Sequence, residues 1–294
     1  MKMCMATVSL GGGLEEKIDA IAAAGFDGIE LLDADLREST MSPGECARRC
    51  ADLGLTIDLY QPFRRAEGVS HDEFGAVQAR FRRELEVMRE IGADSILVVS
   101  NTDDDADSSR DLSVAQLSAL GDVAAEHGVT VMFEALAWGT HISRVADAWE
   151  VLQRADHPNL TLVVDTFHLI ARGEDITILS ELPAGSVGFL QLADAPLLSM
   201  DLMHWSRGHR CFPGEGQMDL LAPIGTDLSS GYDGPVSLEI FNPGYRERDT
   251  HELARAGAKA LGEFIDELGT KANTPSSTWT DAGVQRLSAQ VGSL

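Results

Sequence analysis

Basic residues are scarce in this chain. The sequence holds 23 Lys and Arg against 47 Asp and Glu, so its formal net charge is −24 at pH 7. Binding to nucleic acid or to an anionic membrane surface depends on Lys and Arg contacts with phosphate, and we therefore expect neither kind of partner. A small anionic ligand would need a local basic pocket.

Long apolar runs are also missing. No stretch approaches the roughly 18 consecutive apolar residues that span a bilayer. The N-terminal segment MKMCMATVSLGGG has too short an apolar run for a secretory signal peptide. These absences favour a soluble, cytoplasmic protein.

Cysteine is rare, with four residues in 294. Cys46 and Cys50 are four positions apart and would share one face of a helix, but no pair has CxxC spacing. A zinc site built on this pair would need two more soft ligands nearby, whereas Cys4 and Cys211 come from the ends of other strands. We expect reduced thiols and no zinc–thiolate site.

The chain shows instead a regular alternation of short apolar runs and helical patterns. Its length and its 44% hydrophobic content suit one large domain. Continuous apolar runs are typical of strands buried on both faces, and eight strand–helix units in strict alternation predict an α/β fold, a closed (β/α)8 TIM barrel. The expected strands are 4–10, 28–32, 56–61, 95–100 and 236–240, with VTVMFEAL, LTLVVDTFH and VGFLQLADA between the last two.

The helical patterns fall between these runs. One runs from residue 14 to a stop at Gly25, and the others cover 43–53, 72–91, 114–127, 143–155, 176–182 and 250–268. A long insertion, 195–219, is expected to fold tightly over the barrel mouth. We expect the catalytic domain over 1–270, and the polar segment 271–294 reads as a tail or linker.

Four expected strands end in a residue that offers a hard oxygen ligand: Glu134, Asp165, Gln191 and Glu239. In such barrels the chemistry lies at the carboxyl ends of the strands, where these residues fall. Three carboxylates converging there would raise one another's pKa values unless a cation lies between them. We therefore expect one divalent metal ion of the hard, oxygen-preferring kind.

Five motifs carry a family resemblance: FEALAWGTH, VVDTFH, FLQLADAP, WSRGHRCFPGEG and SLEIFN occur in this order. Together they resemble the bacterial 3-dehydroshikimate dehydratases, within the wider xylose-isomerase-like group of metal-dependent barrels. The resemblance covers 1–270. It implies conversion of 3-dehydroshikimate to protocatechuate (3,4-dihydroxybenzoate) and water with Mg²⁺, Mn²⁺ or Co²⁺, and metal ligands at the same four positions.

Gln191 departs from the wider group, many of whose members have a His at this position, although it matches the dehydratase subset. An amide oxygen in place of an imidazole shifts the preference towards hard ions such as Mg²⁺ and Mn²⁺. Some related proteins fuse the dehydratase barrel to a domain similar to 4-hydroxyphenylpyruvate dioxygenase, and the sequence leaves open whether this chain is part of a longer one.

The implied substrate is a ring β-hydroxy ketone that bears a carboxylate. Its dehydration begins with loss of a proton next to the ketone, through an enolate that a metal would stabilise. We favour His168 as the base, with a hydrogen bond to a ligand carboxylate as its alternative role. For the substrate carboxylate Arg210 is the first choice, and Arg64 and Arg65 are the alternatives.

Further candidates line the same expected loops. Ser206 and His209 would donate to substrate hydroxyls or protonate the leaving group, or else be ordinary polar loop residues. His141 would orient a ligand, face the substrate or serve in packing. Trp138, Trp205 and Phe212 would line the cavity around the substrate ring or belong to the core.

Other functions remain open at this point. A sugar isomerase or epimerase would use the same barrel and the same first step, but a neutral sugar needs no Arg fork. An endonuclease would need several metals, more His ligands and a basic face. The third alternative is a barrel that binds a ligand but catalyses no reaction. We expect a small-molecule substrate, and the sequence leaves homo-oligomerisation open.

Overall fold

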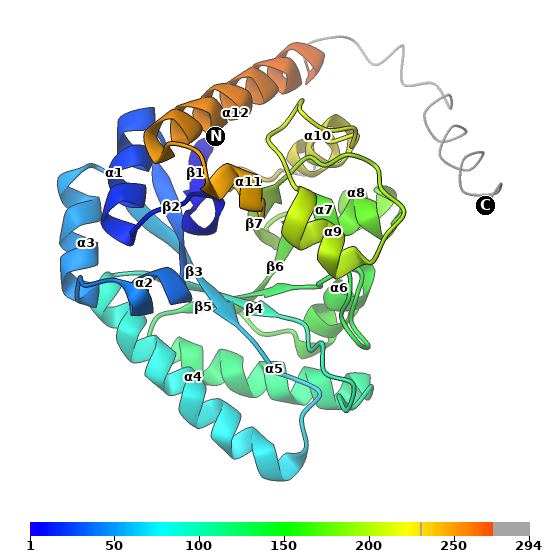
Figure 1. The fold of residues 1–294 in the computed structure, drawn as a ribbon. Helices are drawn as coiled ribbons and strands as arrows, with labels where there is room; N and C mark the ends of the chain where they lie inside the picture. Colours follow the sequence, from blue (N-terminus) through cyan, green and yellow to red (C-terminus); the bar gives the residue numbers. More distant parts are fainter. Residues whose placement is uncertain (230, 273–294) are drawn as a thin grey trace.

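The computed structural model describes residues 1–229 and 231–272, which form a closed barrel of eight parallel strands (Figure 1). The strands pair in chain order, and β8 closes on β1. This confirms the expected fold. The strands are β1 (Lys2–Ala6), β2 (Gly28–Leu32), β3 (Thr56–Phe63), β4 (Ser95–Val99), β5 (Thr130–Glu134), β6 (Leu160–Asp165), β7 (Val187–Leu192) and β8 (Pro235–Leu238).

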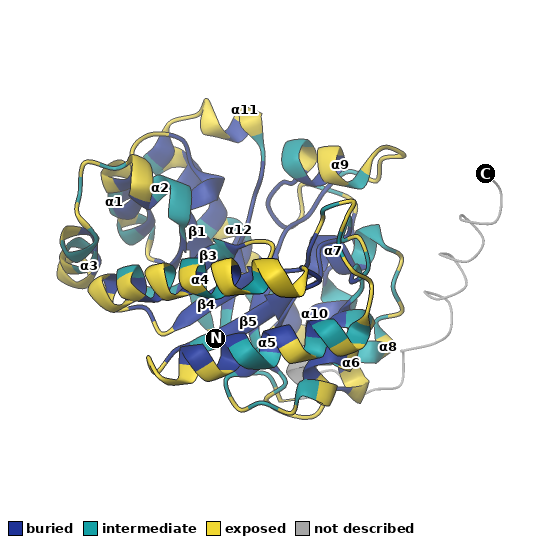
Figure 2. Cartoon of the chain, turned by 90° about the horizontal axis from the view of Figure 1, so that it is seen from below, coloured by how far each residue is buried: buried dark blue, intermediate teal, exposed yellow. Residues whose placement is uncertain are grey.

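Helices surround the barrel and bury their apolar faces against the strands, while their outer faces are exposed (Figure 2). Within the described residues, no helix combines the length and apolar character that crossing a membrane requires. The helices are α1 (Leu14–Ala24), α2 (Asp33–Glu38), α3 (Pro43–Asp52), α4 (His71–Ile91), α5 (Arg110–Ala125), α6 (Val145–Ala155), α7 (Thr166–Ala171), α8 (Thr177–Glu181), α9 (Leu202–His209), α10 (Leu221–Ser229), α11 (Pro243–Arg246) and α12 (Thr250–Ala272).

The first and last strands are shorter than expected. β1 ends at Ala6, and a 3-10 turn over Thr7–Ser9 follows it. Ser9 Oγ donates to the carbonyl of Leu238 at 3.1 Å and accepts from the amide of Ile240 at 2.9 Å. These side-chain bonds replace strand pairing, so that Glu239 lies just beyond β8.

The expected tail, 271–294, lies outside the described residues except for its first two positions, which end α12. The four cysteines are buried and form no disulfide. Cys46 and Cys50 lie on α3, as their spacing predicts.

Candidate active site

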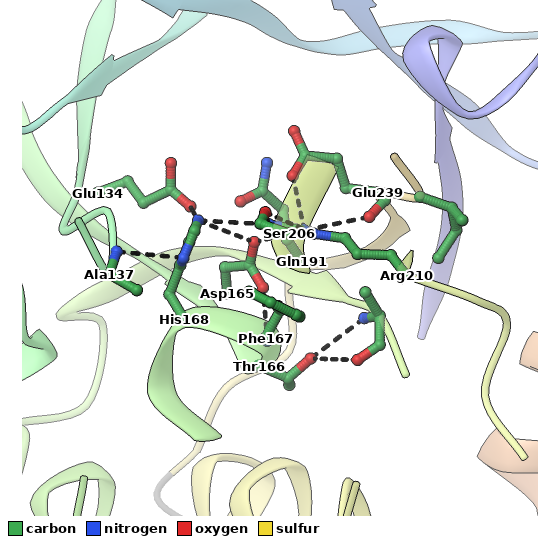
Figure 3. A network of polar contacts seen from close by, with 12 residues as sticks. Glu134, Ala137, Asp165, Thr166, Phe167, His168, Gln191, Ser206, Arg210 and Glu239 are labelled. Atoms are coloured by element: carbon green, nitrogen blue, oxygen red, sulfur yellow. Dashed lines mark hydrogen bonds and ion pairs between the residues drawn. The ribbon is translucent and has the colours of Figure 1, made fainter. Parts of the chain in front are cut away.

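The polar residues at the carboxyl ends of the strands form one layer across the barrel mouth. Successive side chains on a strand point to opposite faces. Met132, Val163 and Phe189, each two positions before a candidate ligand, pack into one apolar cluster with Leu59 and Leu97. Glu134, Asp165 and Gln191 therefore point inward above this cluster, and Glu239 joins them from the end of β8 (Figure 3).

The Arg210 guanidinium lies among these carboxylates and is 1% exposed. Its Nη1 donates to Asp165 Oδ2 at 2.8 Å and to Glu239 Oε2 at 3.0 Å. Its Nε and Nη2 both face Ser206 Oγ, at 3.1 and 2.9 Å, and Nη2 also lies 3.3 Å from His168 Nε2. All three guanidinium nitrogens are therefore engaged within the protein.

A single guanidinium does not balance the carboxylates, so the layer keeps an excess of negative charge. Burial, followed by the charges of Asp165 and Glu239, raises the pKa of Glu134 well above its usual value. Burial also raises the pKa of Glu239, although the charge of Arg210 opposes that rise. Converging carboxylates that resist ionisation are the setting in which a divalent cation lowers the free energy of the charged forms.

The amide of Gln191 supplies a direct test of whether the residues fit a cation. Its Nε2 donates to Glu30 Oε1, so the nitrogen is already engaged. Its Oε1 is buried and has no hydrogen-bond partner within the described residues. A buried acceptor without a donor is costly, and a metal ion would satisfy it. The donor set of carboxylate and amide oxygens thus fits a hard divalent ion.

Glu30, on β2, fixes that orientation from below. It is fully buried, and its Oε2 accepts from Ser237 Oγ at 2.8 Å. Its Oε1 accepts from the Nε2 of Gln61 at 2.9 Å as well as from Gln191. Gln61 Nε2 also lies 2.9 Å from Glu239 Oε1. Burial, followed by the charge of Glu239, raises the pKa of Glu30 well above its usual value, whereas the hydrogen bonds from Ser237 and Gln191 favour the ionised form. An ionised Glu30 only accepts, so in that form both amides present their nitrogen to it.

His168 lies in the same group as two of the expected ligands. One potential ligand atom each from Glu134, Asp165 and His168 lie within 4.8 Å of one another. The other two expected ligands contact other residues of the layer. Glu239 contacts Arg210 and Gln61, and the amide nitrogen of Gln191 contacts Glu30. The structure thus brings the four residues into one layer, and their joint coordination of a metal stays a prediction.

The imidazole of His168 is held neutral. Burial, followed by the charges of Arg210 and Arg207, holds its pKa well below the usual value. Its Nδ1 accepts from the backbone amide of Ala137 at 3.2 Å, and its Nε2 lies 3.6 Å from oxygens of Glu134 and Asp165. A neutral imidazole can take up a proton, which is what a general base requires.

A cavity opens above this layer. Glu134, His168 and Glu239 face it from below, and its walls include Trp138 and the unpredicted Phe241. Apolar walls with a few convergent polar groups are typical of small-molecule sites. A second cavity, next to 182–188, lies away from these residues.

Several expected substrate contacts lie outside the lining of this cavity. Arg65 pairs with Asp103 at 2.7 Å, and His209 is exposed at the end of α9. His141 turns to the buried Glu67, with 2.7 Å between Nε2 and Oε2. Phe212 packs against Tyr245 in the core. Arg65, His141 and Phe212 each contact another residue, and His209 is exposed to solvent. Of the two Arg alternatives, only Arg64 lines the cavity.

Arg210 and Ser206 take a different place from the one expected. Arg210 lines the cavity floor, but its donors contact Asp165, Glu239 and Ser206, which leaves no free fork for a substrate carboxylate. Ser206 is fully buried and bonds to that guanidinium. Trp205 is a core residue whose Nε1 donates to the carbonyl of Pro196 at 3.0 Å.

Asp194 anchors the insertion that carries these residues. Its Oδ1 accepts from the backbone amides of Ala195 and Met218, and its Oδ2 accepts from those of Gly214 and Gly216, at 2.7 to 3.0 Å. A Cβ at Gly216 would lie 2.2 Å from Oδ1. The insertion is therefore pinned at both ends, and it presents α9 at the barrel mouth (Figure 2).

Sequence reasoning missed Glu30, Gln61, Phe241 and Arg207. Glu30 had a detectable signal, because it interrupts the apolar run GIELL as Glu134 interrupts its own strand. Gln61 ends its expected strand in the same manner. Arg207 lies on α9, and Arg210 directly follows the last residue of that helix. Sequence spacing does not indicate which of two such residues faces a cavity.

The closed barrel and its mouth define the class of protein. Residues 18–264 match the family model described as xylose isomerase-like TIM barrel, and the chain belongs to this family. The chain is 43% identical over 261 residues to a 3-dehydroshikimate dehydratase of Pseudomonas putida. That match covers 89% of this chain and 41% of the relative, so the chain spans about two fifths of the relative's length.

Solved structures agree with this assignment. A fusion protein of a xylose isomerase-like TIM barrel with 4-hydroxyphenylpyruvate dioxygenase superposes with a TM-score of 0.91 at 41% identity, over 95% of this chain and 45% of that one. The IOLI protein, solved with a bound zinc atom, superposes with a TM-score of 0.83 at 19% identity, over 91% of this chain and 99% of that one. The similarity to the IOLI protein shows that the two chains share a fold.

Proposed function

We propose that this chain is a metal-dependent dehydratase that converts 3-dehydroshikimate to protocatechuate and water. The observation that carries the proposal is the inward layer of carboxylates, with the Gln191 oxygen that no described residue donates to, beneath a cavity that Arg64 and Arg207 line. The name of the relative from Pseudomonas putida, at 43% identity, supports the same reaction.

In this proposal one divalent ion, Mg²⁺, Mn²⁺ or Co²⁺, is held by Glu134, Asp165, Gln191 and Glu239. When bound, it supplies positive charge that stabilises the negative charge developing at the substrate ketone. The bound zinc of the IOLI protein supports a metal site in this fold, although oxygen ligands favour a harder ion here.

His168 carries the proton transfers in this proposal. Its neutral ring accepts the proton next to the ketone at Nε2 and then delivers it to the departing hydroxyl, which leaves as water. Enolisation of the remaining ketone completes the aromatic ring. The role places the proton of the resting ring on Nδ1. The Ala137 amide and Nδ1–H then both donate and lose their hydrogen bond, which costs about 1–3 kcal/mol for each donor that stays buried.

Arg210 and Ser206 act on the protein side of the site. The guanidinium holds Asp165 and Glu239 at fixed positions through the contacts at 2.8 and 3.0 Å. Ser206 fixes the guanidinium in turn. Trp138 and Phe241 exclude water from the reacting ring, which strengthens every charge interaction around it.

The test is the appearance of protocatechuate absorbance when 3-dehydroshikimate is added to chelator-stripped protein before and after Mg²⁺, Mn²⁺ or Co²⁺ is returned. We expect product only after metal return. A His168→Gln protein should retain metal and lose turnover by about 100-fold or more, the usual range for a general base. Absence of product with all three metals would reject the dehydratase and favour the isomerase or epimerase alternative, tested on ketose and aldose substrates.

A further inference from the structure

We propose that Arg207, together with Arg64, binds the substrate carboxylate. The inference rests on the proposed function for the identity of the substrate, but the anion site itself is argued from the structure. It assigns to Arg207 the role that sequence reasoning expected of Arg210.

The surroundings of Arg210 exclude it from that role. Its guanidinium is 1% exposed, and its nitrogens contact Asp165, Glu239 and Ser206. To bind a substrate carboxylate it would have to leave two buried carboxylates without their cation, and breaking a buried ion pair is strongly destabilising. An anion brought beside Asp165 and Glu239 would also meet their negative charge.

The Arg207 guanidinium is free by comparison. Within the described residues, no hydrogen bond and no ion pair at 4.0 Å or less involves it. It lines the cavity, and it is partly buried on α9. Burial lowers its pKa to about 10, so it remains cationic at neutral pH. A partly buried cation without a paired anion gains most from an anionic ligand.

Two aromatic rings hold this guanidinium. Its Cζ lies 4.0 Å from the centroid of the Phe241 ring and 5.7 Å from that of Trp138. Contact with a ring face satisfies the face of the planar cation and leaves its edge N–H groups available. The rings that wall the substrate cavity thus also orient the donor fork.

Arg64 supplies a second cation at the same cavity. It follows β3, lines the cavity and is exposed, and no described residue forms an ion pair with its guanidinium. Its charge contributes to the lowered pKa of Arg207, so the two cations act on each other. A carboxylate between them would relieve that repulsion. Because acidic residues outnumber basic residues in the whole chain, we do not expect Arg64 and Arg207 to bind nucleic acid instead.

The experiment compares two ligands that differ by one carboxylate. Binding of protocatechuate and of catechol to the metal-loaded protein is measured by calorimetry for the wild type and for Arg207→Gln, Arg207→Lys and Arg248→Gln. Arg248 is a matched control, because it also lies over an aromatic ring, 5.4 Å from Tyr245, but is exposed outside the cavity. Circular dichroism verifies that each variant is folded.

We expect Arg207→Gln to weaken protocatechuate binding by about 10- to 100-fold, the range for a charge-assisted hydrogen-bonded pair, and to leave catechol binding within about twofold. Arg207→Lys should fall between the two, because it keeps the charge and loses the fork. KM for 3-dehydroshikimate should rise in parallel, with kcat less affected. Arg248→Gln should match the wild type in every measurement.

Unchanged protocatechuate affinity in a folded Arg207→Gln protein would overturn the inference. Equal losses for both ligands would also overturn it, because they would indicate a role in cavity shape. Benzoate separates this inference from the proposed function: an Arg207-dependent benzoate site in a protein that makes no protocatechuate would retain the anion site and reject the reaction. A wild-type protein that binds no ring carboxylate and makes no product would reject both.

Discussion

At the scale of single residues, the orientation of one amide decides which of its atoms faces the proposed metal site. Gln191 offers a nitrogen on one side and an oxygen on the other, and only the oxygen is a ligand. Glu30 takes the nitrogen, and the oxygen is left buried and unpaired. A carboxylate that contacts no substrate therefore acts on the site through a neighbour, as partners of metal ligands commonly do.

Replacement of Glu30 tests this arrangement. A Gln at position 30 can donate to the amide oxygen of Gln191, so the amide can turn and withdraw that oxygen from the site. We expect Glu30→Gln to weaken Mn²⁺ binding by about 10- to 100-fold, as measured by calorimetry or electron paramagnetic resonance. Glu84→Gln is the control, since Glu84 accepts a hydrogen bond from Tyr60 outside the layer. Equal Mn²⁺ affinities in the two variants would contradict the role of Glu30.

At the scale of elements, the insertion after β7 is a pinned loop. Four backbone amides converge on Asp194, and an antiparallel bridge pairs Asp194 with Cys211. The anchor lies beside the stretch that carries Arg207 and Arg210. The placement of both guanidinium groups therefore depends on one buried carboxylate outside the cavity lining.

Loss of that carboxylate should lower the stability of the protein. Asp194→Ala leaves four backbone amides without their acceptor, at about 1–3 kcal/mol for each one that stays buried. We expect the free energy of unfolding to fall by at least about 3 kcal/mol in urea denaturation. Asp201→Ala removes a single exposed helix cap on α9 and should cost about 1 kcal/mol. Similar losses in the two variants would show that Asp194 does not anchor the insertion.

At the scale of the whole molecule, the fold and the site are held by different interactions. The main apolar cluster joins strands and helices around the barrel, and it includes residues from β1 to α12. The acidic layer has its own cation in Arg210. We therefore expect the barrel to fold without a metal, unlike small metal-folded domains.

Metal removal should accordingly abolish turnover and preserve the fold. We expect chelator-treated protein to keep its far-ultraviolet circular dichroism and a cooperative thermal transition. Saturating Mg²⁺ or Mn²⁺ should raise the midpoint, because binding at 100 times Kd adds about 2.7 kcal/mol to the free energy of unfolding. Loss of the dichroism signal on chelation would contradict this separation of fold and site.

The sequence by itself determined the barrel and the inward layer. Eight apolar runs alternating with helical patterns allow few topologies, and side chains on parallel strands alternate with a period of two. Residues that end strands, such as Glu134 and Asp165, must then meet at one end of the barrel. Glu30 lies in the middle of β2, so only its interruption of an apolar run marks it in the sequence.

Only the tertiary structure decided which residues of the loops serve the site. Arg207 lies on α9 and Arg210 directly follows that helix, and the docking of α9 sends Arg210 to the acidic layer and Arg207 to the aromatic walls. His141 is taken by Glu67, which lies 74 positions away in the chain. Charge and hydrogen-bond energies depend on distances of a few ångströms, and distances between side chains on separate loops are set by packing, which no local pattern encodes.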